Sequence, residues 1–556
     1  MAQAADAGTA GDKGAFAPLR EPTFRRIWIS SLFSNFGQLI LGVGAAWEMT
    51  RLSSSPSMVA LVQTAMMVPL MLVALPAGAL ADMFDRRKIA LTGLGFSMLS
   101  SAALTTLAFF GLTTPWLLLG FCMLIGAGVA LYSPSWQASI SEQVSTERLP
   151  AAVALGTISY NVARSFGPAI GGLIVLAAGA KAAFAINATF YIPLWIAFFF
   201  WQRRHAPSRL PPERIDRAIV SGARYALHAH PVRTVLMRAF AFGLATASSS
   251  ALAPLIARDL LHGTAATYGI LLGASGVGAV GGALFVGHLR ARVSVEVAVR
   301  VFAVLSGLSL AAISLVHTLA ATCAALFVLG ACNILTVALL NVGVQLSAPR
   351  WVTARALSLY SSALTGGIAF GAWMWGMVAS AHGTAFALAA SGMAVVATAV
   401  LGYVLPLPQD SEVDTESVDI GHEPEVALAL TMRSGPVIIE VEYDVAPDRA
   451  RAFYDLMLQI QKLRLRNGGF DWSISRDIAD PAIWTERYHC PTWGDYLRMR
   501  DRYTQADLDL QIEADAFNQS GHGRRVRRRL ERPFGSVRWK ADSPDPQIPT
   551  VGYLGP

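Results

Sequence analysis

The sequence predicts an all-α membrane bundle of twelve transmembrane helices in two six-helix halves, followed by a small α+β domain. Hydrophobic residues make up 54% of the chain and charged residues only 15%, whereas soluble domains average about 25% charged residues. Twelve apolar runs are long enough to cross a bilayer core, which requires about 20 residues per helix. A motif between the second and third runs also returns, in diluted form, 204 residues later.

The apolar runs group into two predicted domains, 25–202 and 233–405, and a flexible cytoplasmic segment, 1–24, precedes the first. Such runs must be helical because lipid offers the backbone no hydrogen-bond partners. Buried helices of a soluble protein are the alternative, and a count of twelve argues against it. The expected spans are 25–50, 56–82, 88–111, 115–140, 152–178, 183–202, 233–257, 266–289, 294–317, 320–346, 354–379 and 384–405.

The repeated motif indicates an internal duplication. Gly78-Ala79-Leu80 recurs as Gly282-Ala283-Leu284, and the register then holds through later helices. Duplicated halves around a central site are a common plan of transporters. The other pairs at this offset are Arg86 with Arg290, Lys88 with Arg292, Gly126-Ala127 with Gly330-Ala331, Ala152 with Ala356, and Gly167 with Gly371.

The basic residues predict the orientation. One set of loops carries most of the arginines, among them Arg86 and Arg290, and the opposite set holds only Arg51, Lys181 and Arg258. Because basic residues concentrate in cytoplasmic loops, both termini should be cytoplasmic. We expect the bundle to lie in the cytoplasmic (inner) membrane. The net charge of +7 is therefore a topology signal, and we expect no nucleic-acid partner.

Two polar connections separate the domains. The cytoplasmic linker 203–232 contains an amphipathic stretch, 215–220, that would lie on the membrane surface or form part of a solvated linker. The second connection, 406–433, is rich in Asp and Glu and predicts a flexible chain.

A soluble domain is predicted over 434–535, with a tail over 536–556. Strand patterns and helical periodicity alternate in a βαββαβ order, which is that of ferredoxin-like folds. The expected elements are a strand at 437–443, a helix at 448–466, strands at 472–475 and 483–488, a helix at 493–517 and a strand near Val526. The basic run 524–529 would either touch anionic lipid or form a solvated strand edge.

The sequence predicts no metal site, cofactor or disulfide framework. The four cysteines form no CxxC pair, and three of them lie in apolar runs. No G-x-x-x-x-G-K-[ST] loop is present, so we do not expect direct drive by ATP.

The repeated motif resembles the signature loop of the major facilitator superfamily, roughly G-x-L-A-D-x-x-G-R-K/R. Gly78, Leu80, Asp82, Arg86 and Arg87 match it, while Asp85 replaces the usual glycine. The fifth span carries a second motif, similar to the G-P-x-x-G-G element of proton-coupled drug exporters. Its residues are Gly167, Pro168, Gly171 and Gly172, which the resemblance identifies as a helix bend.

A bundle with a Gly-Pro-led soluble tail is similar to the secretion-effector branch, which includes exporters of enterobactin-type siderophores. The resemblance implies a major facilitator fold, alternating access and export coupled to protons. The tail residues that match are Gly435-Pro436, Glu442-Tyr443, Phe453, Trp472, Arg476-Asp477, Glu486, Thr492-Trp493 and Asp507. The tail also resembles small dimeric monooxygenases, a likeness of fold that does not carry activity but suggests self-association.

The resemblance assigns a gating role to the signature loop, with Gly78 permitting close helix approach. It implies that Asp82 meets the start of the eleventh span near Ala354, where the helix dipole is positive. Arg86 would pair with an acid at the end of the fourth span, for which Glu142 is the candidate. Alternatively, these charges only anchor the loops, which is our interpretation of Arg87 and Lys88.

Arg164 is the most informative polar residue within a span, because a charge near mid-membrane is costly unless it faces a cavity or a partner. Asn161 lies one turn earlier on the same face. Arg164 could bind an anionic substrate, respond to proton movement, or bond to helix carbonyls. The other candidates for a substrate or proton pathway, each also explicable by helix packing, are Asn35, Gln38, Asn333, Asn341 and Tyr360.

These observations favour a secondary active exporter of a small organic molecule such as a siderophore, drug or secondary metabolite. An importer or facilitator is the first alternative, because the fold permits both directions. A membrane-anchored enzyme or sensor acting through the tail is the second, although an anchor would not need a duplicated set of helices.

Overall fold

The computed structural model describes residues 16–83, 85–202, 224–225, 228–290, 293–349, 352–407, 424, 426–428, 430–519 and 523–531. Contacts divide the chain into two compact units. The first comprises Met1–Ile219, Thr234–Gly343 and Leu357–Leu407, and the second comprises Val220–Arg233, Val344–Ala356 and Pro408–Pro556. The linker helix expected at 215–220, the acidic stretch 409–423 and the tail 536–556 lie outside the described residues.

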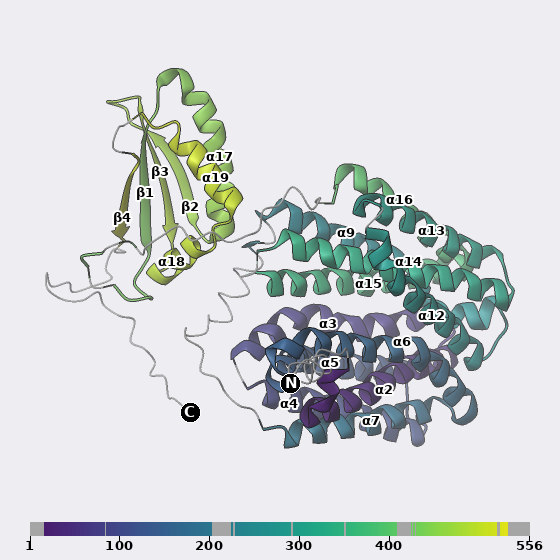
Figure 1. Cartoon of the computed structure of the whole chain (residues 1–556). Helices are drawn as coiled ribbons and strands as arrows, with labels where there is room; N and C mark the ends of the chain where they lie inside the picture. Colours follow the sequence, from purple (N-terminus) through teal and green to yellow (C-terminus); the bar gives the residue numbers. More distant parts are fainter. Residues whose placement is uncertain are drawn as a thin grey trace, which may run out of the picture. The chain divides into compact units, whose positions relative to one another are not determined.

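The first unit is helical (Figure 1), and its elements begin and end within a few residues of the expected spans. The first group of helices follows a short turn, η1 (Ala17–Arg20), and the second group begins at α9. The first group is α2 (Pro22–Leu52), α3 (Pro56–Met83), α4 (Arg86–Phe109), α5 (Pro115–Gln143), α6 (Leu149–Ala178) and α7 (Ala180–Phe200). The second is α9 (His230–Thr246), α10 (Ser248–Ala251), α11 (Ala253–Leu255), η3 (Ile256–Leu260), α12 (Ala265–Arg290), α13 (Val295–Leu315), α14 (Leu319–Ser347), α15 (Thr353–His382) and α16 (Thr384–Val404).

Among the described residues, eleven helical segments are long and apolar enough to cross a membrane, where the sequence analysis expects twelve. The element outside this set is α15, which is 30 residues long but rich in glycine, serine and tryptophan. The seventh segment, His230–Leu260, is interrupted rather than continuous. Pro254 supplies no backbone donor there, so the chain continues as short helical pieces and a π turn.

The 204-residue offset recurs in the structure. The bounds of α14, α15 and α16 each lie 204 residues beyond those of α5, α6 and α7. Gly179 ends α6 with φ +78° and Gly383 ends α15 with φ +89°, a conformation that only glycine adopts readily. The contacts match as well, because Gly167 of α6 packs against Leu39 of α2, and Gly371 of α15 packs against Leu244 of α9.

Small residues set the helix spacing within the first unit. A Cβ at Gly126 would lie 2.8 Å from the Met66 carbonyl oxygen, and one at Gly93 would lie 2.9 Å from that of Gly128. The backbones of neighbouring helices are therefore in contact, as is usual in membranes, where the hydrophobic effect does not drive helices together.

The second unit contains a four-stranded antiparallel sheet in the order β2-β3-β1-β4. Helices α17 and α19 lie along one face of it (Figure 1). The buried faces of the strands pack on these helices around Tyr443, Phe453 and Met457. The elements are β1 (Val437–Asp444), η4 (Pro447–Arg449), α17 (Ala450–Asn467), β2 (Phe470–Arg476), β3 (Ile483–Cys490), α18 (Trp493–Asp501), α19 (Gln505–Asp515) and β4 (Arg525–Leu530).

The helix expected at 493–517 is two helices, so that prediction was wrong in detail. Thr504 lies between the two helices and caps the second, since it forms a capping box with Asp507.

The basic run 524–529 also has a structural explanation. Arg527 and Arg529 face Glu442 and Glu440 across the sheet at 3.7 and 3.1 Å, so they belong to cross-strand ion pairs.

Candidate translocation path and signature loop

The signature loop leads into α4 through Asp85, whose side chain accepts a hydrogen bond from the Arg87 backbone at 2.9 Å. Arg86 donates to Glu142 at 3.0 Å and to the Ala138 carbonyl at 2.9 Å, which links α4 to the end of α5. The two charged side chains are about four-fifths buried, with exposures of 21% and 18%. The structure thus brings Arg86 and Glu142 together. Gly78 and Asp82 lie in α3, and with Ala354 they fall outside the part whose side chains are described.

Arg87 caps the C-terminal end of α7. Its guanidinium donates to the carbonyls of Phe198 and Phe199 and lies over the Phe199 ring. A similar contact occurs at the end of α16, where Arg300 of α13 donates to the Gly402 carbonyl at 2.9 Å and stacks over Tyr403. The contacted residues there lie 204 residues beyond Phe198 and Phe199, whereas Arg300 does not lie at this offset from Arg87. Both arginines satisfy carbonyls that a helix end leaves unpaired.

Sequence reasoning missed the charge cluster around Glu296, in which Arg238 of α9 and Arg300 both donate to this carboxylate. The backbone of Leu407 donates to it at 3.0 Å. The i, i+4 spacing of Glu296 and Arg300 could have predicted their ion pair from the sequence. The pairing with Arg238 could not be predicted in this way, because it depends on how α9 packs against α13.

Arg164 lies at mid-length in α6 and is exposed. Thr157, Tyr160 and Asn161 share its face by helical spacing. Thr157 and Tyr160 are exposed and Asn161 is partly buried, and the Asn161 amide donates to the Thr157 carbonyl at 3.0 Å. The exposed residues on the opposite side of α6 are apolar: Ile158, Val162, Phe166, Ile170 and Leu173. The helix therefore has two exposed faces of different character, and only the apolar face suits lipid.

The remaining candidates are dispersed. Asn35 of α2 donates to Ser159 of α6 at 3.3 Å, and Gln38, one turn later on α2, is partly buried. The Tyr360 hydroxyl donates to the Val337 carbonyl at 2.8 Å, a contact that joins α15 to α14. Asn333 and Asn341 lie on α14 and are partly buried; within the described chain, the Asn333 Oδ1 has no hydrogen-bond partner.

The G-P-x-x-G-G motif lies where α6 crosses α12. A Cβ on Gly172 would lie 2.7 Å from Gly269 Cα, and one on Gly269 would lie 2.9 Å from Gly172 Cα. Ser165 donates to the Gly276 carbonyl at 3.2 Å. On its other side, Gly171 faces Ile40 and Val43 of α2. A second crossing of this kind joins α3 to α15, where Thr64 donates to the Ala369 carbonyl at 2.9 Å.

Across the described residues, no group of three or more His, Cys, Asp or Glu side chains is arranged to hold a metal ion. All four cysteines are free thiols.

The family described as transmembrane secretion effector matches residues 13–534. Among curated proteins, the MFS-type transporter YfiS of Bacillus subtilis (strain 168) is 27% identical over 163 residues, 28% of this chain and 38% of the relative. The staphyloferrin A transporter of Staphylococcus aureus (strain NCTC 8325 / PS 47) is 28% identical over 171 residues, 30% of this chain and 42% of the relative. The chain thus matches about two fifths of each curated relative's length.

Solved structures show the same bundle fold. The POT family transporter PepTSo superposes with a TM-score of 0.56 at 13% identity, covering 69% of this chain and 97% of that one. A bacterial homolog of the human lysosomal transporter Spinster, in an inward-facing conformation, gives a TM-score of 0.53 at 14% identity, over 70% and 95% of the two chains. At these identities the likeness concerns the fold alone.

Proposed function

The chain belongs to the transmembrane secretion effector family of major facilitator transporters, and we propose that it exports a small organic molecule by alternating access. It is a multi-pass membrane protein of a family whose members are not enzymes. Export would be coupled to the proton gradient, and both termini would lie on the cytoplasmic side of the inner membrane. The staphyloferrin A transporter among its relatives favours a siderophore or similar metabolite as cargo.

The observation that supports the proposal is the equivalence of α5, α6 and α7 with α14, α15 and α16 at one offset; we infer from it two sets of six helices, with α15 as the eleventh span. Equal helix bounds, two positive-φ glycines at one offset and similar arginine contacts at the ends of α7 and α16 all support a duplicated transporter core. Transport by rocking two such halves about a central site needs this arrangement.

The proposed path runs along the polar face of α6. Arg164 is long, permanently charged and exposed at mid-helix, and its neighbours Thr157 and Asn161 are polar. Because a charge in the membrane is retained where it meets water, substrate or a counter-charge, this face would line the central site. Asn35 and Gln38 on α2, and Asn333, Asn341 and Tyr360 on the second half, would border or support it.

The signature loop would act as a cytoplasmic gate. The Arg86–Glu142 pair would hold the ends of α4 and α5 as one unit, and Asp82 would meet the start of α15 near Ala354 when the cytoplasmic side closes. Gly78 would allow that approach, and Gly167, Pro168, Gly171 and Gly172 would form the bending and crossing surface of α6.

The test is transport by purified protein in proteoliposomes, offered candidate siderophores and drugs. Transport of the compound in the export direction should stop when the proton gradient is dissipated. Arg164→Gln should abolish it at a normal level of inserted protein, and Arg164→Lys should restore it only in part if the planar guanidinium fork binds the substrate. Movement that requires ATP would refute secondary transport, and lower accumulation of the compound in cells lacking the protein would indicate import.

The C-terminal domain, 434–535, is accessory in this proposal and would self-associate. The free face of its sheet carries cross-strand ion pairs, so association would be polar and sensitive to salt. Mass photometry of full-length protein in nanodiscs at two ionic strengths, compared with a chain ending at residue 409, tests this point.

A further inference from the structure

The C-terminal unit includes a piece of chain from outside the sheet domain, the segment that leads into α9. Residues Val220–Arg233 belong to the same compact unit as the sheet. Arg224 donates to the Gly468 carbonyl at 3.1 Å, and the Arg466 guanidinium lies 6.0 Å from the centre of the Tyr225 ring. Tyr225 is buried. The sheet domain therefore contacts the chain that connects α7 with α9.

The end of α17 supplies the acceptor for Arg224. Gly468 follows Asn467, the last residue of the helix, and has φ +115°, a conformation that glycine adopts readily. The N–H groups of Gly468 and Gly469 donate back into the last turn of α17. The Gly468 carbonyl lies beyond the helix and accepts from Arg224. A hydrogen bond from a charged donor is stronger than one between neutral groups.

Asp507 holds the arginine that contacts Tyr225. Its carboxylate is 2% exposed and accepts from the Arg466 guanidinium and, at 3.3 Å, from the Asn467 amide. It also accepts from the Thr504 backbone at 3.2 Å, within the capping box that starts α19. One buried carboxylate therefore fixes Arg466 to the start of α19, and a cation held in this way can rest against an aromatic ring.

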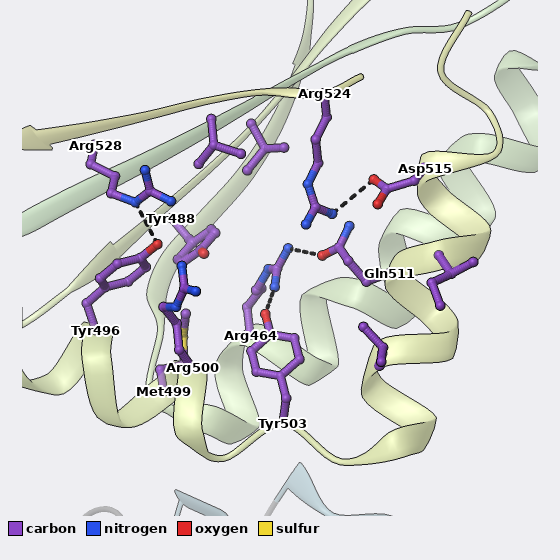
Figure 2. Close-up of a pocket in the computed structure, with 14 residues that line it drawn as sticks. Arg464, Tyr488, Tyr496, Met499, Arg500, Tyr503, Gln511, Asp515, Arg524 and Arg528 are labelled. Atoms are coloured by element: carbon purple, nitrogen blue, oxygen red, sulfur yellow. Dashed lines mark hydrogen bonds and ion pairs between the residues drawn. The ribbon is translucent and has the colours of Figure 1, made fainter. Parts of the chain in front are cut away.

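The last turn of α17 is also held from inside the domain. Arg464 is 3% exposed and contacts the fully buried Glu486 at 2.9 and 3.1 Å. Figure 2 shows Arg464 at the cavity between the sheet and the helices, where it donates to Gln511 of α19 at 2.7 Å and to the Tyr503 hydroxyl. These bonds tie α17 to α19. Groups that are already fixed lose little conformational freedom when a partner docks on them.

The docked segment continues into α9 through a single residue, Ala229. The Ala229 N–H donates to the Tyr225 carbonyl at 2.8 Å, and the Ala229 carbonyl accepts from the Arg233 N–H at 3.0 Å. Helix α9 begins at the next residue, His230. No loop separates the docked residues from α9, so a displacement of this helix displaces them as well.

The covalent connection to the C-terminal domain starts from the same helices. The Leu407 N–H, just beyond α16, donates to Glu296 of α13 at 3.0 Å. Arg238 of α9 binds the same carboxylate and is 4% exposed. Both attachments of the sheet domain, the docked segment and the chain beyond Leu407, therefore begin on helices of the proposed second half.

The docking corner is the group Arg466, Gly468 and Asp507. We propose that residues 224–225 dock reversibly on this corner, and that the C-terminal domain thereby moves with the second half of the bundle. Docking within one chain benefits from an effective concentration in the millimolar range, so a hydrogen bond and a ring contact are sufficient to keep the domain docked. Docking itself does not depend on transport, whereas the shared movement rests on the proposed function.

The experiment measures the distance between two spin labels on the full chain in nanodiscs, by double electron–electron resonance. The native cysteines are replaced, and the labels are carried by Ile478→Cys and Val404→Cys, at exposed positions of the β2–β3 turn and of the end of α16. This pair should give one narrow distance. Tyr225→Leu and Arg224→Met should each weaken docking about tenfold. The distance should then broaden, because a chain of about 20 residues has a reach of about 25 Å.

Matched controls carry the same changes elsewhere on α17. Tyr454→Leu and Arg451→Met alter residues on its exposed side and should leave the distance narrow. Arg224 and Tyr225 are outside the core of the sheet domain, so their substitution leaves that core intact. A broad distance in the unsubstituted chain, or a distance that Tyr225→Leu and Arg224→Met leave unchanged, would overturn the docking.

A second label pair tests the shared movement. Phe200 lies 204 residues before Val404 and is equally exposed, so Ile478→Cys with Phe200→Cys is the equivalent pair to the first half. Gly172→Ala crowds the crossing of α6 and α12 and should shift the distance to residue 200 while the distance to residue 404 stays constant. The opposite result would overturn the shared movement. Two constant distances would count against moving halves, and thus against the proposed function, while docking is judged by Tyr225→Leu alone.

Discussion

Substituting Gly172 with alanine tests whether the crossing of α6 and α12 controls access to the path. The added Cβ would lie 2.7 Å from both the Gly269 Cα and the Ala265 carbonyl oxygen, whereas carbon atoms prefer about 3.5–4.0 Å. The two helices would therefore have to separate by about 1 Å. Overpacking of this kind costs about 1–3 kcal/mol, so conformations that need this crossing closed become about 5- to 150-fold less favoured.

The assay uses a chain without its four cysteines and with Thr157→Cys on the exposed polar face of α6. In the described conformation the new thiol is accessible, so maleimide should modify it quickly in nanodiscs. Gly172→Ala should slow this modification by up to the factor above, because the favoured conformation then opens at the opposite side. Gly42→Ala is the matched control, since a Cβ there meets nothing within 4 Å. Equal modification rates in the two folded variants would refute the reasoning.

Three further predictions concern the C-terminal unit. Arg464→Met leaves Glu486 buried without its partner and should lower the free energy of unfolding of this domain by about 3–5 kcal/mol, whereas the double variant Arg464→Met with Glu486→Leu should recover most of this loss. Urea-dependent modification of Cys490, followed by peptide mass spectrometry, measures the free energy of unfolding of both variants. Equal stabilities of the single and double variants would contradict the pairing of Arg464 with Glu486. Burial raises the pKa of the Cys490 thiol to about 12 from an ordinary value of 9.0, so the folded domain keeps a proton that the unfolded chain loses, and its stability should fall as pH rises from about 9 toward 12; a Cys490→Ala variant with the same slope would exclude this thiol as the cause. A chain ending at Gln409 should still transport in proteoliposomes, because the described helices from α2 to α16 all precede this residue. A correctly inserted but inactive truncation would show that the C-terminal domain is needed for transport.

Local chemistry made most of the fold predictable. Helix bounds lie close to the long apolar runs, and the structure adds that several helices start at prolines, as at Pro22, Pro56 and Pro115. The prediction failed where a short polar signal decided the outcome, since Thr504 begins a new helix inside what looked like one amphipathic run. The π turn near Ile256 could not be predicted either, because its register depends on packing around Pro254.

The candidate site was predictable only where a motif encodes a contact. The resemblance supplied Arg86 and Glu142 as partners, and they lie 56 residues apart in sequence. Glu486 and Asp507 were noticed as matching residues without a role, because burial beside Arg464 and Arg466 arises from packing distant elements. The same holds for the cavity lined by Arg464, Arg500, Arg524 and Arg528, because these residues come from three elements and a loop.

The contacts within each proposed half differ in chemistry from the contacts between the two halves. Two ion pairs described above each join helices of one proposed half: Arg86 with Glu142 across α4 and α5, and Arg238 with Glu296 across α9 and α13. Several contacts across the two proposed halves involve small residues and backbone atoms, such as Gly172 with Gly269, although Arg258 donates to the Thr50 carbonyl and the Trp47 and Tyr268 rings stack across the same boundary. A charged pair in a membrane is costly to separate, whereas parting a glycine crossing loses dispersion energy and a few neutral hydrogen bonds, such as that from Ser165 to the Gly276 carbonyl. Alternating access requires this asymmetry, because each half must move as a unit while the boundary between them repeatedly breaks and re-forms.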